Sequence, residues 1–258
     1  MAFEYESRTH QVKPFICSTD DFADEHAFLL SEVYPKLRRL CRERGASFDP
    51  YHWDHNLSPA KLNKGQALYL ALECINSACP FFIGLIGNQY GPHRPEESPL
   101  LGRDSETAAP ADHWLDRNIL TAAGYGYRWL LDESYNSASL FELKVTQAAF
   151  LSEETRFCRF YIREKDTASV DRFDKFKLQQ LKTSIAKRGL HVSYYKQLKQ
   201  LGQLVLADWT EIINQLYPPL DTSRVGKSSL ASRQNSTTNG SLLKGFVTVE
   251  NRCFSVSG

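Results

Sequence analysis

The sequence lacks an excess of charge of either sign and lacks an apolar run long enough to cross a membrane. It holds 31 lysine and arginine residues against 30 aspartate and glutamate residues, which leaves a formal net charge of +1. Such a balance gives no overall field that would draw the chain to nucleic acid or to an anionic membrane. The first 13 residues are polar, with no apolar signal-peptide core. These absences predict a cytoplasmic protein with no nucleic-acid partner and no membrane insertion.

The six cysteines show no disulfide framework, because no secretory signal precedes them. Four of them fall within apolar patterns and are predicted to be buried free thiols: Cys17, Cys41, Cys74 and Cys158. A zinc site would need close, regular ligand spacing, which His52 and His55 with Cys74 and Cys79 do not provide. No metal site is therefore predicted.

Short apolar segments alternate along the chain with longer segments that have apolar residues at helical spacing. Strands are expected at 14–19, 47–53, 81–86, 156–162 and 191–195. Helices are expected at 22–41, 68–79, 114–122, 140–151, 173–185 and 198–216. Strands that alternate with helices of this length predict a parallel sheet with right-handed crossovers.

Three local features refine this expectation. The segment 81–86 is apolar throughout, as is typical of a central parallel strand covered on both faces. Pro50 places the segment 47–53 at a sheet edge, and Pro35 should bend the first helix. The predicted fold class is α/β, a doubly wound five-stranded parallel sheet of the flavodoxin-like order 2-1-3-4-5.

The composition changes after the last expected helix. From Asp221 onward the chain is rich in Ser, Thr, Asn and Gly without a helical period. We therefore expect a flexible segment at 1–12, one α/β domain at 13–219 and a disordered tail at 220–258. Gly226-Lys-Ser228 resembles the end of a phosphate-binding P-loop, but Asp221 stands where the first glycine is required, so the match is interpreted as chance.

Several motifs carry a resemblance to a known family. They are Ile16-Cys-Ser-Thr-Asp-Asp-Phe22, Val33-Tyr-Pro-Lys-Leu-Arg38, Leu40-Cys-Arg-Glu-Arg-Gly45 and the strand that leads into Gly87-Asn-Gln-Tyr-Gly91. Over residues 12–219 the chain resembles the TIR-like N-terminal domain of the nephrocystin, tetratricopeptide-repeat and NACHT/WD-repeat proteins, which are STAND ATPases. The resemblance implies a TIR-like fold and a role in signalling or assembly. In that family an ATPase and a repeat array follow; their lack here suggests a truncated or alternatively spliced form.

Two positions depart from the family pattern. Glu25-His26 stands where the family has an acidic residue followed by arginine, and Asp49-Pro-Tyr-His-Trp53 replaces an Asp-x-Arg-Trp-Gly turn. Both changes remove polar groups that would orient a nucleotide.

Ligands of open parallel sheets collect where the strands end, at the carboxyl side. The candidate cofactor-binding residues at this edge are Ser18, Thr19, Asp20, Trp53, Asn88 and Tyr90. TIR enzymes that cleave NAD use one helical glutamate, and Ser139-Leu-Phe-Glu142 resembles that setting, so Glu142 is the catalytic candidate. The alternative interpretation is that Glu142 is a solvated helix residue paired with a basic neighbour.

Three functional hypotheses follow. The leading one is a non-enzymatic module that binds a protein partner or itself and needs no cofactor. The second is an NAD or nucleotide-glycoside hydrolase that uses Glu142, and the third binds an adenine nucleotide or ADP-ribose without turnover. The basic residues of the segment 175–188 are interpreted as a solvated helix face rather than a docking patch: Lys175, Lys177, Lys182, Lys187 and Arg188.

Overall fold

A computed structural model describes residues 10–52, 65–101, 114–164 and 171–219. Its main sheet has five parallel strands: β2 (Phe15–Cys17), β4 (Tyr51–His52), β5 (Phe81–Ile86), β6 (Phe157–Arg163) and β7 (His191–Tyr195). They lie side by side in the order β4-β2-β5-β6-β7. The prediction of an α/β fold with parallel strands is confirmed, and the apolar segment 81–86 lies in the middle of the sheet.

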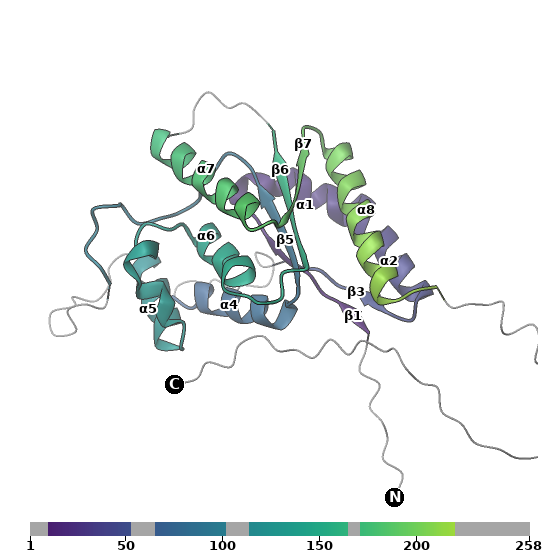
Figure 1. Cartoon of the computed structure of the whole chain (residues 1–258), viewed down its shortest axis with the longest axis horizontal. Helices are drawn as coiled ribbons and strands as arrows, with labels where there is room; N and C mark the ends of the chain where they lie inside the picture. The colour runs from purple at the N-terminus through teal and green to yellow at the C-terminus, as the bar shows by residue number, and fades with distance from the viewer. Residues whose placement is uncertain (1–9, 53–64, 102–113, 165–170, 220–258) are drawn as a thin grey trace, which may run out of the picture.

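Helices cover both faces of the sheet (Figure 1). One face carries α1 (Ala23–Phe28), the π-helical turn η2 (Leu29–Val33), α2 (Tyr34–Glu43) and α8 (Leu198–Leu216). The other carries α4 (Ala67–Ala78), α6 (Leu140–Val145), the π-helical turn η5 (Thr146–Phe150) and α7 (Arg172–Lys187), with α5 (Trp114–Gly124) packed against α4. Short 3-10 turns lie at Asp20–Phe22 (η1), Arg128–Leu131 (η3) and Glu133–Tyr135 (η4).

The predicted disturbance at Pro35 takes the form of the π-helical turn η2, which ends just before the proline. Proline has no amide hydrogen for the carbonyl four residues earlier, and its ring crowds that carbonyl. A wider π turn in the preceding segment accommodates both effects, so α1 and α2 form one interrupted helical segment.

The expected single strand at 47–53 was wrong, because the structure has two short strands there. β3 (Ser47–Phe48) pairs with β1 (Gln11–Val12), and β4 pairs with β2 in the same register. In this ladder the Asp49 amide donates to the Val12 carbonyl at 3.0 Å, and the Tyr51 amide donates to the Pro14 carbonyl at 2.8 Å. The pattern would next require an amide from residue 14 to reach the Asp49 carbonyl. Pro14 has none, so the ladder is interrupted.

The same alternation explains why Pro50 is tolerated. Because the amides of Asp49 and Tyr51 point toward the inner strand, the nitrogen of Pro50 points toward the open edge. No ladder hydrogen bond is lost at that position.

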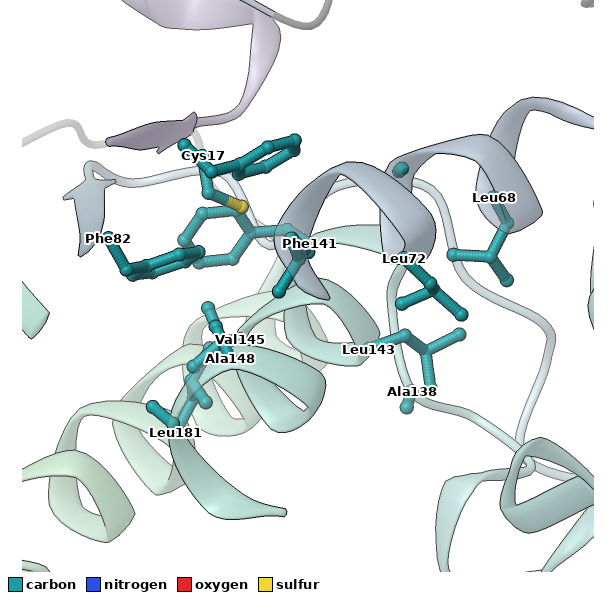
Figure 2. Packing of buried hydrophobic residues seen from close by; sticks show 14 of the residues in the cluster. Cys17, Leu68, Leu72, Phe82, Ala138, Phe141, Leu143, Val145, Ala148 and Leu181 are labelled. Carbon is teal, nitrogen blue, oxygen red and sulfur yellow. The ribbon is translucent and has the colours of Figure 1, made fainter. Parts of the chain in front are cut away.

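Alternate residues of the strands feed two separate cores. Phe82 and Ile86 of β5 join the core beneath α4, α6 and α7, whereas Ile83 and Leu85 join the core beneath α2 and α8. Figure 2 shows the first core, where Phe82 and Cys17 of the sheet meet Phe141 of α6. Burial on both sides accounts for the uninterrupted apolar run of β5.

The cysteines follow the prediction only in part. Cys17, Cys41 and Cys158 are buried free thiols, and burial raises the pKa of Cys158 to about 12. Cys74 is a free thiol but only half-buried. Cys79 is disulfide-bonded, so the expectation that the six cysteines form no disulfide was wrong.

Several expectations fall on residues outside the described ranges. These are the tail at 220–258, the first nine residues of the segment 1–12, Trp53, His55 and the Gly226-Lys-Ser228 match, all of which stay predictions. β1 begins at Gln11, inside the segment expected to be flexible. Among the described helices, none is both long and apolar enough to span a membrane.

Candidate functional site

The carboxyl ends of the strands bring together two networks of polar side chains. The first contains Arg163, the last residue of β6, and Tyr195, the last residue of β7. Arg163 donates to the Glu25 carboxylate at 2.8 Å and to the Asp21 carboxylate. Tyr195 donates its hydroxyl to the same oxygen of Glu25 at 3.1 Å. One guanidinium thus joins two carboxylates from the segment that follows β2.

Close packing holds this Arg163 network in place. The guanidinium also lies over the Phe22 ring at 4.5 Å. A Cβ atom on Gly87 would lie 2.7 Å from the Asp21 carboxylate and 2.8 Å from Arg163. Only glycine leaves room for the network beside the turn after β5.

Burial and charge pairing set the electrostatics of the network. Burial acts to lower the pKa of Arg163, but the hydrogen bond and charge of Glu25 and the charge of Asp21 outweigh it and raise the pKa. Burial, followed by the charge of Glu25, raises the pKa of the Tyr195 hydroxyl. The guanidinium therefore stays charged and the phenol stays neutral at physiological pH.

The second network contains the catalytic candidate. Tyr90, which is fully buried in the turn after β5, donates its hydroxyl to the Glu142 carboxylate. The same hydroxyl accepts the Ser139 amide at 3.3 Å, and the Ser139 side chain caps α6 by accepting the Glu142 amide at 3.1 Å. Burial, followed by the charge of Glu142, raises the pKa of Tyr90. Glu142 is half-buried and lies against the turn after β5.

The other predicted binding residues are placed as follows. Ser18 lies 2.8 Å from the Nε2 atom of His26, and Thr19 donates to Asp21 at 2.5 Å. Asp20 is exposed and Asn88 is half-buried. The structure therefore turns Ser18 and Thr19 toward neighbours in the same segment.

Thr19 and the Tyr90 network nevertheless lie close together. A Cβ atom on Gly91 would be 3.5 Å from the Thr19 methyl group and 3.9 Å from the Ser139 Cβ atom. The structure thus brings Thr19, Tyr90, Ser139 and Glu142 to one place at the sheet edge.

Sequence reasoning missed the Arg163 network. A basic residue as the last residue of a strand was an available signal, because that position faces the carboxyl edge where ligands of such sheets bind. Its partners could not be found in the same way, since Glu25 lies 138 positions earlier in the sequence.

The expectation of a fully solvated basic face on α7 was wrong for two lysines. Lys182 donates to the Gly87 carbonyl at 3.3 Å, and burial lowers the pKa of its ammonium group. Lys177 donates to the Ser137 hydroxyl at 2.9 Å. Both contact the domain, whereas Lys175 and Lys187 are exposed. Arg188 is exposed but donates to the Phe150 carbonyl at 2.7 Å.

A buried arginine organises the loop after β5. Arg94 is 4% exposed and donates to the Asp116 carboxylate at 2.8 Å, to the Asn136 amide oxygen and to the Pro99 carbonyl at 2.8 Å. All three partners come from the protein itself, which indicates a structural role for Arg94.

Among the described residues, no cluster of three or more potential ligands could hold a metal ion. Chemically, the carboxyl edge offers the Glu142 carboxylate beside a buried phenol, together with the exposed carboxylate of Asp20. Arg163 at this edge is already paired with Asp21 and Glu25.

The chain is similar in sequence to several proteins that are named for tetratricopeptide repeats. No family model matches the chain, and no solved structure matches it. The chain is 32% identical over 247 residues to tetratricopeptide repeat protein 41 of Rattus norvegicus, covering 82% of this chain and 18% of the rat protein. It is 32% identical over 237 residues to putative tetratricopeptide repeat protein 41 of Homo sapiens, covering 80% and 18%. A TPR repeat-containing protein of Dictyostelium discoideum is 24% identical over 224 residues, covering 81% and 12%.

The chain therefore spans about a fifth of the length of the rat and human proteins, since the shared portion is 18% of each, and a smaller share of the Dictyostelium discoideum protein. Tetratricopeptide repeats are stacked helical pairs with a period of about 34 residues. The described part of this chain instead alternates helices with parallel strands. The described part of this chain therefore differs in architecture from the repeats that name its relatives.

Proposed function

Because the chain is a homologue of one portion of tetratricopeptide repeat proteins, we propose that it is a TIR-like protein-interaction domain of a STAND-ATPase-type protein. It binds protein partners and turns over no substrate. The strand order β4-β2-β5-β6-β7, with helices on both faces, supports the TIR-like part of this proposal.

One observation supports the non-enzymatic part: Arg163 at the carboxyl edge is already paired with Asp21 and Glu25. A nucleotide needs a free cation or free amide donors for its phosphates. Recruiting Arg163 for this purpose would leave Asp21 and the buried Glu25 without their cation. Breaking a buried ion pair costs about 3–5 kcal/mol, which a bound phosphate would have to offset beside two carboxylates.

Exposed aromatic side chains support a role in binding proteins. Trp114 is 48% exposed, Tyr125 is 57% exposed and Phe176 is 60% exposed. Aromatic residues are enriched in protein interfaces, where they supply much of the binding energy. The surface near α5 and α7 therefore offers side chains suited to contact with a partner.

The proposal is tested by incubating the full chain with NAD and measuring nicotinamide release by chromatography. We expect no release above background, even at high protein concentration, where self-association would favour assembly of a TIR-like site. Release by the wild type that disappears in a folded Glu142→Gln variant would make the protein an enzyme and overturn the proposal.

A second candidate, an NAD or nucleotide-glycoside hydrolase, is favoured by the position of Glu142. Its carboxylate lies against Tyr90 at the edge where ligands of such sheets bind. A carboxylate stabilises a developing cation only from a few ångströms away, so this function requires a ribose bound directly beside Glu142.

Calorimetry distinguishes nucleotide binding without turnover from the protein-interaction function and from the hydrolase function. The full chain is titrated with NAD, ADP-ribose and ATP, and we expect no saturable heat. Saturable binding that is weakened in Tyr90→Phe, together with no nicotinamide release, would identify a nucleotide-binding module instead.

A further inference from the structure

The strand β7 forms an open edge of the main sheet. β6 lies on one side of it, and no described strand lies on the other. The Tyr195 carbonyl accepts the Glu164 amide at 2.8 Å, so the backbone of Tyr195 points toward β6. Because neighbouring residues of a strand alternate, the backbone groups of Val192 and Tyr194 point toward the open side.

Few side chains among the described residues hydrogen-bond to the backbone groups of Val192 and Tyr194 on the open side. The Gln200 side chain approaches the Tyr194 carbonyl at 3.5 Å, which is at the limit for a hydrogen bond. The Tyr194 side chain is 53% exposed beside this edge. A row of such amides and carbonyls is a ready template for another strand.

β7 also lacks the residues with which proteins usually block an edge. Its five residues, His191–Tyr195, include no proline and no lysine, arginine, aspartate or glutamate. The opposite edge carries Pro50, whose nitrogen points outward. The difference indicates that the β7 edge is kept available for pairing.

Basic side chains flank this uncharged edge on both sides. Lys187 and Arg188 precede the strand, Lys196 and Lys199 follow it, and all four are exposed; Arg188 also donates to the Phe150 carbonyl at 2.7 Å. Glu164 lies 3.9 Å from Lys196, but the two side chains are 48% and 72% exposed, so solvent screens this pair. The surroundings of the β7 edge therefore favour an acidic ligand.

We propose that the β7 edge binds an extended acidic segment of a partner protein, which adds to the sheet as a sixth strand. This inference rests on the proposed function, because it names the surface and the kind of partner. The backbone of Val192 and Tyr194 supplies the hydrogen bonds, and the four flanking basic residues select the charge of the segment.

The same charges argue against a second copy of this chain as the occupant. Antiparallel pairing of two β7 strands about Ser193 would bring Lys187 and Arg188 of one copy toward Lys196 and Lys199 of the other. Like charges at close range destabilise such a pair, whereas an acidic segment gains from the same four residues.

The test uses the full chain, labelled with nitrogen-15, and a synthetic peptide with a Val-Thr-Val-Thr-Val centre and acidic residues at both ends. Amide exchange is followed by NMR during titration. We expect the Val192 and Tyr194 amides to become at least about tenfold more protected, because they gain hydrogen-bond acceptors. The Ser193 amide, which already faces β6, should change little.

Two control peptides separate strand addition from other binding. The first is methylated on alternate backbone nitrogens, which removes the donors that pair with an edge, and the second has lysines in place of the acidic residues. Neither should protect the two amides. Equal protection by the methylated peptide, or no protection by the acidic one, would overturn the inference.

A matched pair of variants tests the charge selection. K196E/K199E should weaken binding of the acidic peptide by about tenfold or more, which corresponds to about 1.4 kcal/mol. K36E/R39E makes the same charge change on exposed residues of α2 and should leave the affinity unchanged. Equal weakening by both pairs would show that only net charge matters and would overturn the docking site.

The remaining outcomes are also decisive. If sedimentation shows dimers in which Val192 and Tyr194 are protected without peptide, a second copy occupies the edge and the inference is wrong. Nicotinamide release from NAD would overturn the proposed function alone, since peptide protection is measured independently. No protection together with no nicotinamide release would overturn this inference alone.

Discussion

Removal of the Arg163 cation should destabilise the domain severely. Arg163→Met keeps much of the side-chain volume but leaves Glu25 and Asp21 as two neighbouring carboxylates. The Glu25 side chain is 4% exposed, so water cannot compensate its charge. Losing one partner of a buried ion pair costs about 3–5 kcal/mol. We expect the free energy of unfolding to fall by about 3 kcal/mol, the lower end of that range, because Asp21 is 17% exposed and water screens its charge in part.

A loss of this size is readily measured by urea denaturation followed by circular dichroism. The thermal midpoint should fall by roughly 6–12 °C, at about 2–4 °C per kcal/mol for a domain of this size. Adding E25Q and D21N to the variant should restore part of the stability, because the two amides leave no uncompensated charge.

The matched control is Arg156→Met. Arg156 is exposed at the start of the same strand, over the Phe157 ring, and its loss should cost less than about 1 kcal/mol. A cost below about 1 kcal/mol for Arg163→Met would refute the reasoning, since it is the value expected of a surface pair.

Three further predictions follow from buried groups. Tyr90→Phe should lower the free energy of unfolding by about 1–3 kcal/mol, measured by thermal unfolding, because Glu142 and the Ser139 amide lose a buried partner. The control Tyr125→Phe changes a residue that is 57% exposed and should cost under about 0.5 kcal/mol. Cys158 should react with maleimide far more slowly than half-buried Cys74 at pH 8, because burial raises its pKa to about 12; equal labelling by mass spectrometry would contradict this. Burial, then Glu25, raises the pKa of Tyr195, so stability should hold below about pH 10 and fall above it as unfolded tyrosine ionises; tyrosinate absorbance that precedes unfolding would argue against this.

The fold of this chain differs from the repeats that name its relatives. The shared portion of the rat and human proteins is 18% of their length, and the corresponding part of this chain is a parallel α/β structure. Experiments on this portion therefore address a module that is distinct in architecture from tetratricopeptide repeats.

The sequence was most informative where one residue type dictates local structure. The uniform apolarity of Phe81–Ile86 indicated a strand buried on both faces, and β5 does feed both cores. Gly45 and Gly189 lie just after α2 and α7, and both adopt a φ of +69°, the left-handed conformation that glycine allows at a helix end. Signals of this kind need no knowledge of distant residues.

The sequence was least informative about interactions between segments. Pro50 marked an edge, but the interruption at 47–53 depends on Pro14 in the neighbouring strand, which only the register reveals. Glu142 could be proposed from its local motif, whereas its contact with Tyr90 spans 52 positions. Local patterns cannot specify such pairs, because many arrangements of the same elements are compatible with them.

By itself, then, the sequence determined the alternation of strands and helices and which faces of them are buried, because apolar periodicity and chain stiffness act over a few residues. Only the tertiary structure decided that Arg163 would meet Asp21 and Glu25 instead of a ligand, and that β7 would be left at an open edge. Both results depend on which strands become neighbours, and that choice is made by packing of the whole domain.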